Sequence, residues 1–175
     1  SDLMIISDYA KNTLSEELIQ EIIKTCMQKR KQVIIDPRPA HTNAYENASF
    51  ITPNFEEACR MVGKELPRTL ENAEFLAKSL AEKLNCTIIL TLDKDGMLVY
   101  EGKTKHFPIY QREVRDVSGA GDTVVSAIAV GLANQLNLEE TVYFANHAAG
   151  VKVEKIGVQP VLLEEVIKDI ELHNN

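Results

Sequence analysis

The chain has 175 residues, which is long enough for one domain with a substantial core and short for two. Hydrophobic residues make up 45% of it, which excludes a disordered chain, and its net charge of −7 argues against non-specific binding to nucleic acid or to an anionic membrane. The three cysteines are widely spaced, and neither a membrane-spanning run nor a signal-peptide pattern is found, so we expect a cytoplasmic protein with reduced thiols.

Predicted strands and helices alternate along most of the chain. Uniformly apolar runs predict four strands buried on both faces, at residues 3–6, 33–35, 49–51 and 87–92. Apolar residues at helical spacing predict helices that begin near residue 13 or 15, at residues 52–53, and near residues 69, 119, 138 and 161. Residues 97–100 and 103–109 predict a hairpin, and residues 36–47 predict an irregular loop over a site. This order predicts an α/β fold, a three-layer sandwich with a mostly parallel sheet covered on both faces.

Segment 116–123 is the strongest functional signal in the sequence, and it precedes a helix of small apolar residues. Gly119, Ala120 and Gly121 leave the backbone N–H groups at the helix start accessible, and the helix dipole adds partial positive charge there. Such a start forms an anion hole for a phosphoryl group, and Asp122 beside it is suited to accept the proton of an attacking hydroxyl. The alternative is a glycine-rich turn in which Asp122 only caps the helix.

This segment resembles the signature Asp-Thr-x-Gly-Ala-Gly-Asp of the ribokinase-like (pfkB) carbohydrate kinases, with Val117 where threonine is common. The resemblance implies that Asp122 is the catalytic base and that Gly119, Ala120 and Gly121 form the anion hole. It also implies a ribokinase-like fold, ATP as phosphoryl donor, Mg²⁺ as metal cofactor and a small sugar as acceptor.

A second segment, 52–57, is similar to the family's Thr-Pro-Asn-x-x-Glu. The resemblance implies that Asn54 and Glu57 help to place magnesium and phosphate, largely through water. At this spacing the two side chains lie on one face of a helix, as that role requires. The alternative is that both residues only cap the helix and form its first turn.

A third segment, 91–96, is similar to the family's Thr-x-Gly-x-x-Gly, in which backbone contacts the nucleotide phosphates. Thr91 and Gly96 match this pattern, and the resemblance implies that they bind the nucleotide, while Asp93 replaces a glycine. The extra carboxylate predicts weaker ATP binding through charge repulsion, unless Lys94 or magnesium offsets it.

Segments 7–11 and 144–157 are similar to the kinase domain of the ADP-heptose synthesis enzymes of lipopolysaccharide core biosynthesis. That domain phosphorylates D-glycero-D-manno-heptose 7-phosphate at its anomeric hydroxyl. The resemblance implies that Asn146 lies near the adenosine of ATP; the alternative is a small-residue helix packed in the core. The four histidines show no metal-like spacing, and we expect His147 in solvent or at the edge of the core.

The resemblance covers nearly the whole chain. It implies that residues 1–175 are the C-terminal part of one ribokinase-like kinase domain, without the N-terminal half, the lid and most sugar-binding residues. We therefore expect little kinase activity from the chain alone. Apolar faces that the other half would cover predict a homo-oligomer. The expected ligands are ATP and a sugar phosphate, and no nucleic acid or membrane partner is expected.

Two alternatives to a heptose phosphate kinase stay open. One is a kinase of the same superfamily that acts on another sugar or on a nucleoside. The other is a non-catalytic nucleotide-binding or assembly module that keeps the fold, which the carboxylate of Asp93 favours.

Overall fold

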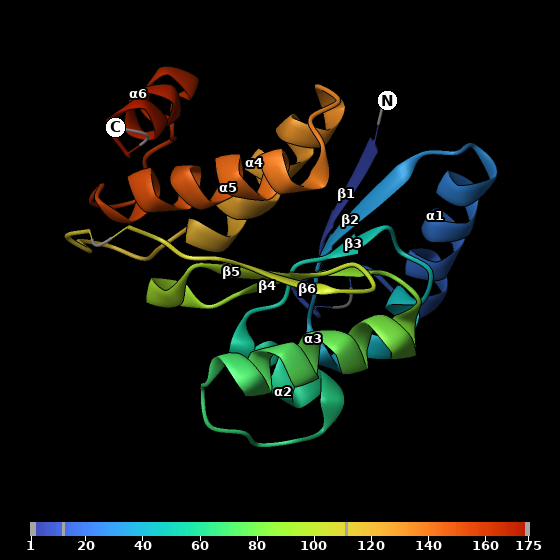
Figure 1. The fold of residues 1–175 in the computed structure, drawn as a ribbon. Helices are drawn as coiled ribbons and strands as arrows, with labels where there is room; N and C mark the ends of the chain where they lie inside the picture. Colours follow the sequence, from blue (N-terminus) through green and yellow to red (C-terminus); the bar gives the residue numbers. More distant parts are fainter. Residues whose placement is uncertain (1–2, 12, 111, 174–175) are drawn as a thin grey trace. The chain divides into compact units, whose positions relative to one another are not determined.

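The computed structural model describes residues 3–11, 13–110 and 112–173, which form two compact units (Figure 1). The first unit contains the residues up to 93 together with 97–106, and the second contains 94–96 and the residues from 107 onward. Within the described ranges, no helix has both the length and the apolar character needed to cross a membrane.

The first unit is built on a six-stranded sheet whose strands lie side by side in sequence order. The strands are β1 (Leu3–Ser7), β2 (Gln32–Asp36), β3 (Phe50–Ile51), β4 (Thr87–Thr91), β5 (Met97–Tyr100) and β6 (Thr104–Phe107). Strands β1 to β4 are parallel, with Ile6 opposite Ile35 in the first pair, and β5 runs antiparallel to β4. The predicted α/β class and the mostly parallel sheet are therefore confirmed.

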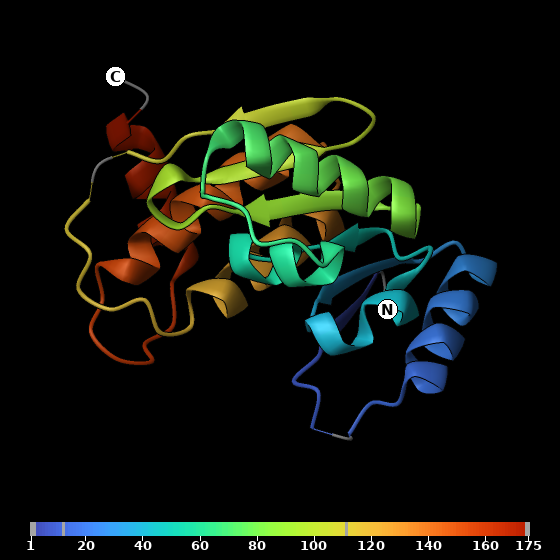
Figure 2. The same cartoon turned by 90° about the horizontal axis from the view of Figure 1, so that it is seen from below.

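Three helices of the first unit enclose its hydrophobic core together with the sheet; Figures 1 and 2 show two of them, α2 and α3, on the same side of the strands. The helices are α1 (Glu16–Gln28), α2 (Phe55–Val62) and α3 (Leu70–Leu84). Their apolar stripes pack against strand side chains such as Ile35, Ile88 and Leu98, which are fully buried. All three cysteines are free thiols.

The stretch 36–47 is more ordered than the irregular loop that the sequence predicts. It contains a 3₁₀ helix, η1 (Pro39–Tyr45), and Tyr45 at its end is fully buried. The Tyr45 hydroxyl donates to the carboxylate of Asp8 at 2.7 Å and also accepts from the N–H of Arg38 at 2.9 Å. The two prolines of this stretch obscure its helical pattern, so the sequence predicted neither the 3₁₀ helix nor the burial of Tyr45.

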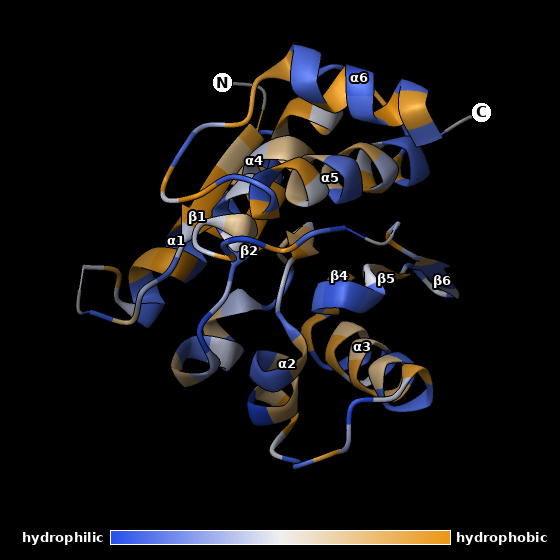
Figure 3. Cartoon of the chain, turned by 90° about the vertical axis from the view of Figure 1, so that its left-hand side faces the viewer, coloured by the Kyte–Doolittle hydropathy of each residue, from blue (hydrophilic) through white to orange (hydrophobic). Residues whose placement is uncertain are grey.

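The second unit is helical and consists of α4 (Ala120–Ala133), α5 (Leu138–Val153) and α6 (Leu163–His173). Helices α4 and α5 pack closely: a Cβ at Gly131 would lie only 2.9 Å from the Thr141 side chain. Helix α5 begins with a capping box between Asn137 and Glu140. The ribbon of α6 alternates between hydrophilic and hydrophobic residues (Figure 3), as an amphipathic surface helix does.

Candidate functional site

Helix α4 begins at the segment that the sequence singles out. Its N-cap is Gly119, whose left-handed backbone (φ +76°) suits glycine because no Cβ is present. The hydroxyl and the N–H of Thr123 both donate to the carbonyl of Gly119, at 2.8 and 3.0 Å. Because its N-cap residue is a glycine, α4 lacks the N-cap side chain that caps α1, α2, α3 and α5. The first turn of α4 therefore offers its N–H groups to a ligand.

The residues of the predicted anion hole differ in the use of their N–H groups. The N–H of Ala120 donates to the carbonyl of Val117 at 3.1 Å and so closes the turn. Gly121 is the second helical residue, where the N–H has no carbonyl partner inside the helix. Apart from its chain neighbours and the nearby backbone of its own helix, no described atom lies within 4 Å of the position that a Cβ would take at Gly121. A ligand can therefore approach its backbone. We expect Gly119 and Gly121 to contribute more to an anion hole than Ala120.

Asp122 is the third residue of α4, and its side chain is exposed. It lines a cavity of about 550 Å³ whose wall is mostly apolar and is formed by α4, α5, residues 158–161 and α6. Gly119, not Asp122, occupies the N-cap position of α4, and the part that Asp122 plays in the reaction stays a prediction. An exposed carboxylate at this cavity can accept a proton from a bound hydroxyl group.

The loop before α4 is fixed by Asp116. Its carboxylate accepts from the N–H of Ser118 at 2.8 Å and from the N–H of Gly157 at 2.9 Å. These bonds, that of Ser118 first, hold the pKa of Asp116 below its ordinary value. The N–H groups of Arg115 and Asp116 donate in turn to the carbonyl of Val153, at 2.8 and 3.1 Å. The loop is therefore tied both to the end of α5 and to the segment that follows it.

In the first unit, Asn54, Glu57 and Thr91 lie together near the carboxyl ends of parallel strands, the edge at which α/β proteins bind ligands. Asn54 bridges to Thr91, whose N–H donates to the carbonyl of Pro53 at 2.9 Å. Asn54 caps α2: its side-chain oxygen accepts from the N–H of Glu57 at 2.8 Å, and the Glu57 carboxylate accepts from the N–H of Asn54 at 3.0 Å. Arg38 donates to the other oxygen of Glu57.

These contacts bear on a magnesium ion at Asn54 and Glu57. Both side chains present oxygen atoms, the ligand type that Mg²⁺ prefers. Each oxygen already accepts one hydrogen bond, but each has a second lone pair. A hydrated ion held through water fits this pair, whereas direct coordination competes with the capping box. Both residues do cap the helix, and a water-mediated metal role stays a prediction.

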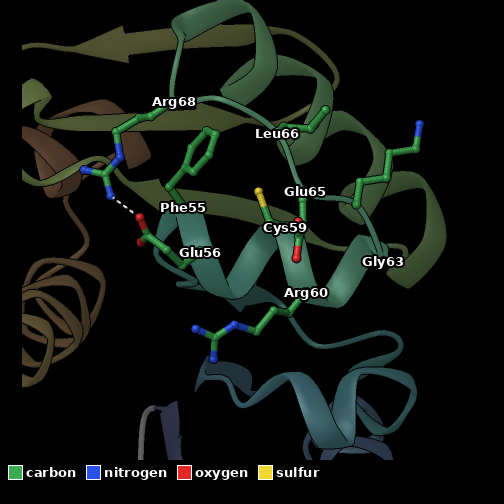
Figure 4. A pocket seen from close by; sticks show the side chains of 9 residues that line it. Phe55, Glu56, Cys59, Arg60, Gly63, Glu65, Leu66 and Arg68 are labelled. Atoms are coloured by element: carbon green, nitrogen blue, oxygen red, sulfur yellow. Dashed lines mark hydrogen bonds and ion pairs between the residues drawn. The ribbon is translucent and has the colours of Figure 1, made fainter.

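Asp93 has a partner that the sequence motif does not reveal. Its carboxylate accepts from Arg68, whose guanidinium also binds Glu56, as the dashed line in Figure 4 marks. Asp93 has a left-handed backbone (φ +50°), which explains why glycine suits this position in the family pattern. Arg68, which is shared with Glu56, therefore offsets part of the charge that was expected to repel ATP, a role the sequence suggested for Lys94 or magnesium.

Arg68 also lines a surface cavity of about 590 Å³ formed by α2 and the segment that follows it (Figure 4). Phe55, Cys59 and Leu66 supply apolar wall, and charged side chains such as Arg60 supply the rest. Its wall includes none of the residues predicted to bind ATP, sugar or magnesium, so we do not assign it to the phosphoryl-transfer site.

Gly96 and Asn146 meet at the carbonyl of Phe107 in the second unit. The buried amide of Asn146 donates to the carbonyls of Phe107 and Pro108, at 3.2 and 3.0 Å. Gly96 has a positive φ of 86°, and a Cβ there would lie 2.1 Å from the Phe107 carbonyl oxygen. Both residues therefore shape the chain at 107–109, and their contacts with a nucleotide stay predictions.

We expect Gly96→Ala to destabilise the protein by roughly 2–4 kcal/mol, because the left-handed backbone cost adds to the collision with Phe107. Urea unfolding measures this loss. Gly102→Ala is the matched control, since Gly102 has a similar φ (+73°) with no described atom within 4 Å of its Cβ position. Equal losses in the two variants would show that the collision contributes nothing.

A buried polar cluster at α5 and α6 was not predicted from the sequence. His147 is buried, so the alternative that places it in solvent is wrong, and its Nδ1 lies 2.6 Å from the Asp169 carboxylate. Arg112 donates to both oxygens of Asp169, and His173 stacks on Tyr110. His147, Asp169 and His173 bring three potential metal ligands within 4.8 Å of one another. Because Arg112 already neutralises Asp169, we interpret the cluster as an ion-pair network.

We expect this cluster to make the protein less stable as the pH falls below about 6.5. Burial lowers the pKa of His147 below its ordinary value, and this effect, together with the nearby Arg112 and His173, outweighs the opposing carboxylate of Asp169. The unfolded chain therefore takes up the proton of His147 more readily than the folded chain. Neutral His147 therefore contributes its whole stabilisation above the pKa that histidine has in the unfolded chain. This stabilisation is lost as the pH falls through the lower pKa of His147 in the folded chain.

The measurement is the urea midpoint between pH 7.5 and 5.0 in the wild type and in His147→Gln. The wild type should lose stability across this range, and the variant should lose less. Identical pH dependence in the two proteins would contradict the assignment to His147.

A second unpredicted cluster surrounds Asp8, which directly follows β1. Its buried carboxylate accepts from the Tyr45 hydroxyl at 2.7 Å and from the N–H of Ala10 at 2.7 Å, and it lies 2.7 Å from Nδ1 of His41. Burial alone would raise the pKa of Asp8, but these hydrogen bonds outweigh it and lower the pKa. The signal available in the sequence was a carboxylate placed immediately after a buried strand.

Comparison with protein families and solved structures identifies relatives of the whole chain. The family model described as pfkB family carbohydrate kinase matches residues 1–165. The bifunctional protein HldE of Sulfurimonas denitrificans is 36% identical over 165 residues, covering 94% of this chain and 35% of that protein. HldE of Campylobacter concisus is 38% identical over 164 residues, covering 93% of this chain and 34% of that protein. The chain thus spans about a third of the length of these curated relatives.

Solved structures confirm the ribokinase-like fold. Ribokinase from Thermotoga maritima superimposes with a TM-score of 0.80 at 28% identity, over 98% of this chain and 57% of that chain. Phosphofructokinase-2 from Escherichia coli, in complex with potassium, has a TM-score of 0.88 at 19% identity, over 100% of this chain and 58% of that chain, a likeness in fold. With a family model that matches nearly its full length and relatives above 30% identity, the chain belongs to the pfkB family of carbohydrate kinases.

Proposed function

We propose that this chain carries the ATP-dependent phosphoryl-transfer centre of a carbohydrate kinase. The observation that carries the proposal is the start of α4, where a glycine N-cap and the open backbone of Gly121 lie beside the exposed residue Asp122 at a cavity. Membership of the pfkB family supports the reaction class. Ribokinase from Arabidopsis thaliana, which has a similar fold, was solved with ribose and ATP, and these ligands agree with the proposed substrate classes.

In the proposed reaction, Asp122 accepts the proton of the sugar hydroxyl while that oxygen attacks the γ-phosphorus of ATP. The bond from the γ-phosphorus to the bridging oxygen breaks, and ADP leaves with its electrons. The N–H groups of Gly119 and Gly121 and the dipole of α4 stabilise the charge on the transferred phosphoryl group. The proton then passes from Asp122 to solvent.

The remaining predicted residues are proposed to position the nucleotide and the metal. Mg²⁺, when bound, offsets the charge of the phosphates, and Asn54 and Glu57 would hold it through water. Thr91 and Gly96 would lie beside the nucleotide phosphates. Asn146 would act near the adenosine by holding the chain at Phe107 and Pro108 in place.

For the acceptor we propose D-glycero-D-manno-heptose 7-phosphate, phosphorylated at its anomeric hydroxyl. The support is the likeness of segment 144–157 to heptose kinase domains, together with the HldE relatives. The test is ADP release by the gene product that contains this chain, with ATP, Mg²⁺ and either the heptose phosphate, ribose, fructose 6-phosphate or adenosine. The heptose phosphate should give the highest kcat/KM. A higher value for another acceptor would reassign the substrate, and no ADP release with any acceptor would contradict a kinase.

The ion pair between Arg68 and Asp93 weakens the support for the non-catalytic alternative. That alternative rested on the carboxylate of Asp93, which repels phosphate only while its charge is not offset. Because Arg68 pairs with Asp93, this repulsion is reduced, and we favour the kinase.

We also propose that the chain forms the C-terminal part of a kinase domain and that most sugar-binding residues lie elsewhere in the gene product. The chain covers 57% of the Thermotoga maritima ribokinase chain, which supports this division. Residues 1–175 alone should therefore release little or no ADP under conditions in which the gene product is active. Equal specific activities of the two proteins would contradict the division.

Strand β1 supports a further proposal, self-association of the chain 1–175. In the described part of the sheet β1 lies at one edge, and Met4 and Ile5 on it are 37% and 42% exposed. An apolar edge strand is a template for pairing with a second copy. Sedimentation at tens of micromolar should show dimers or larger species, and a clean monomer would contradict the proposal.

A further inference from the structure

Lys152 is a buried lysine beside the start of α4. It belongs to α5, and only 2% of its surface is exposed. Its Cε lies 3.4 Å from the position that a Cβ would take at Gly119. Its side chain also lines the cavity that Asp122 lines. A cationic side chain that has almost no solvent contact therefore ends next to the predicted anion hole.

The hydrogen bonds of Lys152 leave part of its ammonium group unused. The group has three N–H donors, and one of them donates to the carbonyl of Gly157 at 2.8 Å. Among residues 3–11, 13–110 and 112–173 this is its one hydrogen bond, and none of them forms an ion pair with it. The nearby carboxylate of Asp116 binds the N–H groups of Ser118 and Gly157 instead. Asp116 and Lys152 attract each other through their charges but form no ion-pair contact, so two N–H donors of the buried ammonium group remain for a further anionic partner.

We infer that Lys152 binds a phosphate oxygen at the start of α4, so that the phosphate site consists of its ammonium group and the N–H groups of Gly119 and Gly121. The chemical class of ligand is a phosphate monoester or the terminal phosphate of a nucleotide. The phosphate site itself is inferred from the buried ammonium group. The reaction in which that phosphate takes part rests on the proposed function. The positive charge offsets Asp116 and Asp122, which would otherwise repel a phosphate.

The test is calorimetric titration of the protein with inorganic phosphate at constant ionic strength. Lys152→Met keeps most of the aliphatic stem and removes the charge, and we expect it to weaken phosphate binding by roughly 10- to 100-fold, the range for a lost charge-assisted hydrogen bond. Lys168→Met is the matched control, because Lys168 is an exposed lysine of α6 that does not line the cavity. It should bind phosphate as the wild type does.

A second variant separates charge from loop geometry. Asp116→Asn loosens the anchor of the loop but leaves the Lys152 charge in place. If Lys152 binds phosphate directly, Asp116→Asn should bind it at least as tightly as the wild type, because a repelling charge is gone. A loss in Asp116→Asn equal to the loss in Lys152→Met would show that Lys152 acts only by holding the loop, and would overturn the inference.

A measurement on the wild type covers the case in which Lys152→Met does not fold. The ¹⁵N chemical shift of the Lys152 ammonium should change on addition of phosphate, while that of Lys168 should not. Unchanged Lys152 shifts, unchanged affinity in Lys152→Met, or no phosphate binding by the wild type would each overturn the inference. None of these readouts needs sugar or turnover, so an inactive kinase that binds phosphate through Lys152 would contradict the proposed function alone.

Discussion

Asp122→Asn is expected to lower the turnover of the gene product by about 10²- to 10⁴-fold, the range for loss of a general base. The variant keeps the size of the side chain and its place in the first turn of α4, but the amide cannot accept a proton at neutral pH. Gly119 and Gly121 remain, so the anion hole is intact. The affinity for ATP should therefore change little. Steady-state kinetics gives the turnover, and calorimetry gives the affinity.

The matched control for this experiment is Glu164→Gln, which neutralises an exposed carboxylate in the first turn of α6. Its turnover should equal that of the wild type. If Asp122→Asn also kept full turnover, Asp122 would have no part in the proton transfer. If it lost turnover and ATP affinity together, its role would be in binding rather than in chemistry.

Asp169→Ala is expected to cost roughly 3–5 kcal/mol of stability, the range for breaking a buried ion pair from one side. The Asp169 carboxylate accepts from both terminal nitrogens of Arg112, whose side chain is 4% exposed, and lies 2.6 Å from Nδ1 of His147. Burial alone would raise the pKa of Asp169, but Arg112 and His147 lower it below its ordinary value. Without the carboxylate, a buried guanidinium is left without this partner. Urea unfolding at pH 7 measures the loss.

A double-mutant cycle with Arg112→Met tests whether the cost comes from the pair. Once Asp169 is absent, replacing Arg112 should cost much less than it does in the wild type, because a buried charge is removed. Additive losses would contradict the ion-pair network. Glu164→Ala, on the exposed surface of the same helix, should change the stability by less than about 0.5 kcal/mol.

The buried strands and amphipathic helices could be predicted from the spacing of apolar residues, because each of these elements depends on residues close in sequence. Boundaries were less certain where two local signals compete. The helix predicted from Thr52 and Pro53 begins at Phe55, since Asn54 forms the capping box with Glu57, and the carbonyl of Pro53 bonds to Thr91 instead. In the same way Ser15, rather than Thr13, caps α1.

In the candidate site, too, contacts between residues close in sequence could be predicted and contacts between distant residues could not. Gly119, Gly121 and Asp122 form a local motif, so their arrangement could be predicted from adjacent residues. The partner of Asp93 could not, because Arg68 lies 25 residues away and no pattern links them. Lys152 is a further example, because a lysine in a helical segment is expected to be exposed. Its burial follows from the packing of α5 near Gly119, which the sequence does not show.

The most direct test of the central claim is to follow the transferred phosphoryl group by ³¹P NMR. The gene product that contains this chain is incubated with ATP, Mg²⁺ and D-glycero-D-manno-heptose 7-phosphate. We predict a new anomeric phosphate signal that grows one-for-one with ADP in the wild type, and at least about 100-fold more slowly in Asp122→Asn. Formation of ADP and inorganic phosphate without the new anomeric phosphate signal would contradict phosphoryl transfer to the sugar at the start of α4. Equal rates in the two proteins would contradict Asp122 as the base.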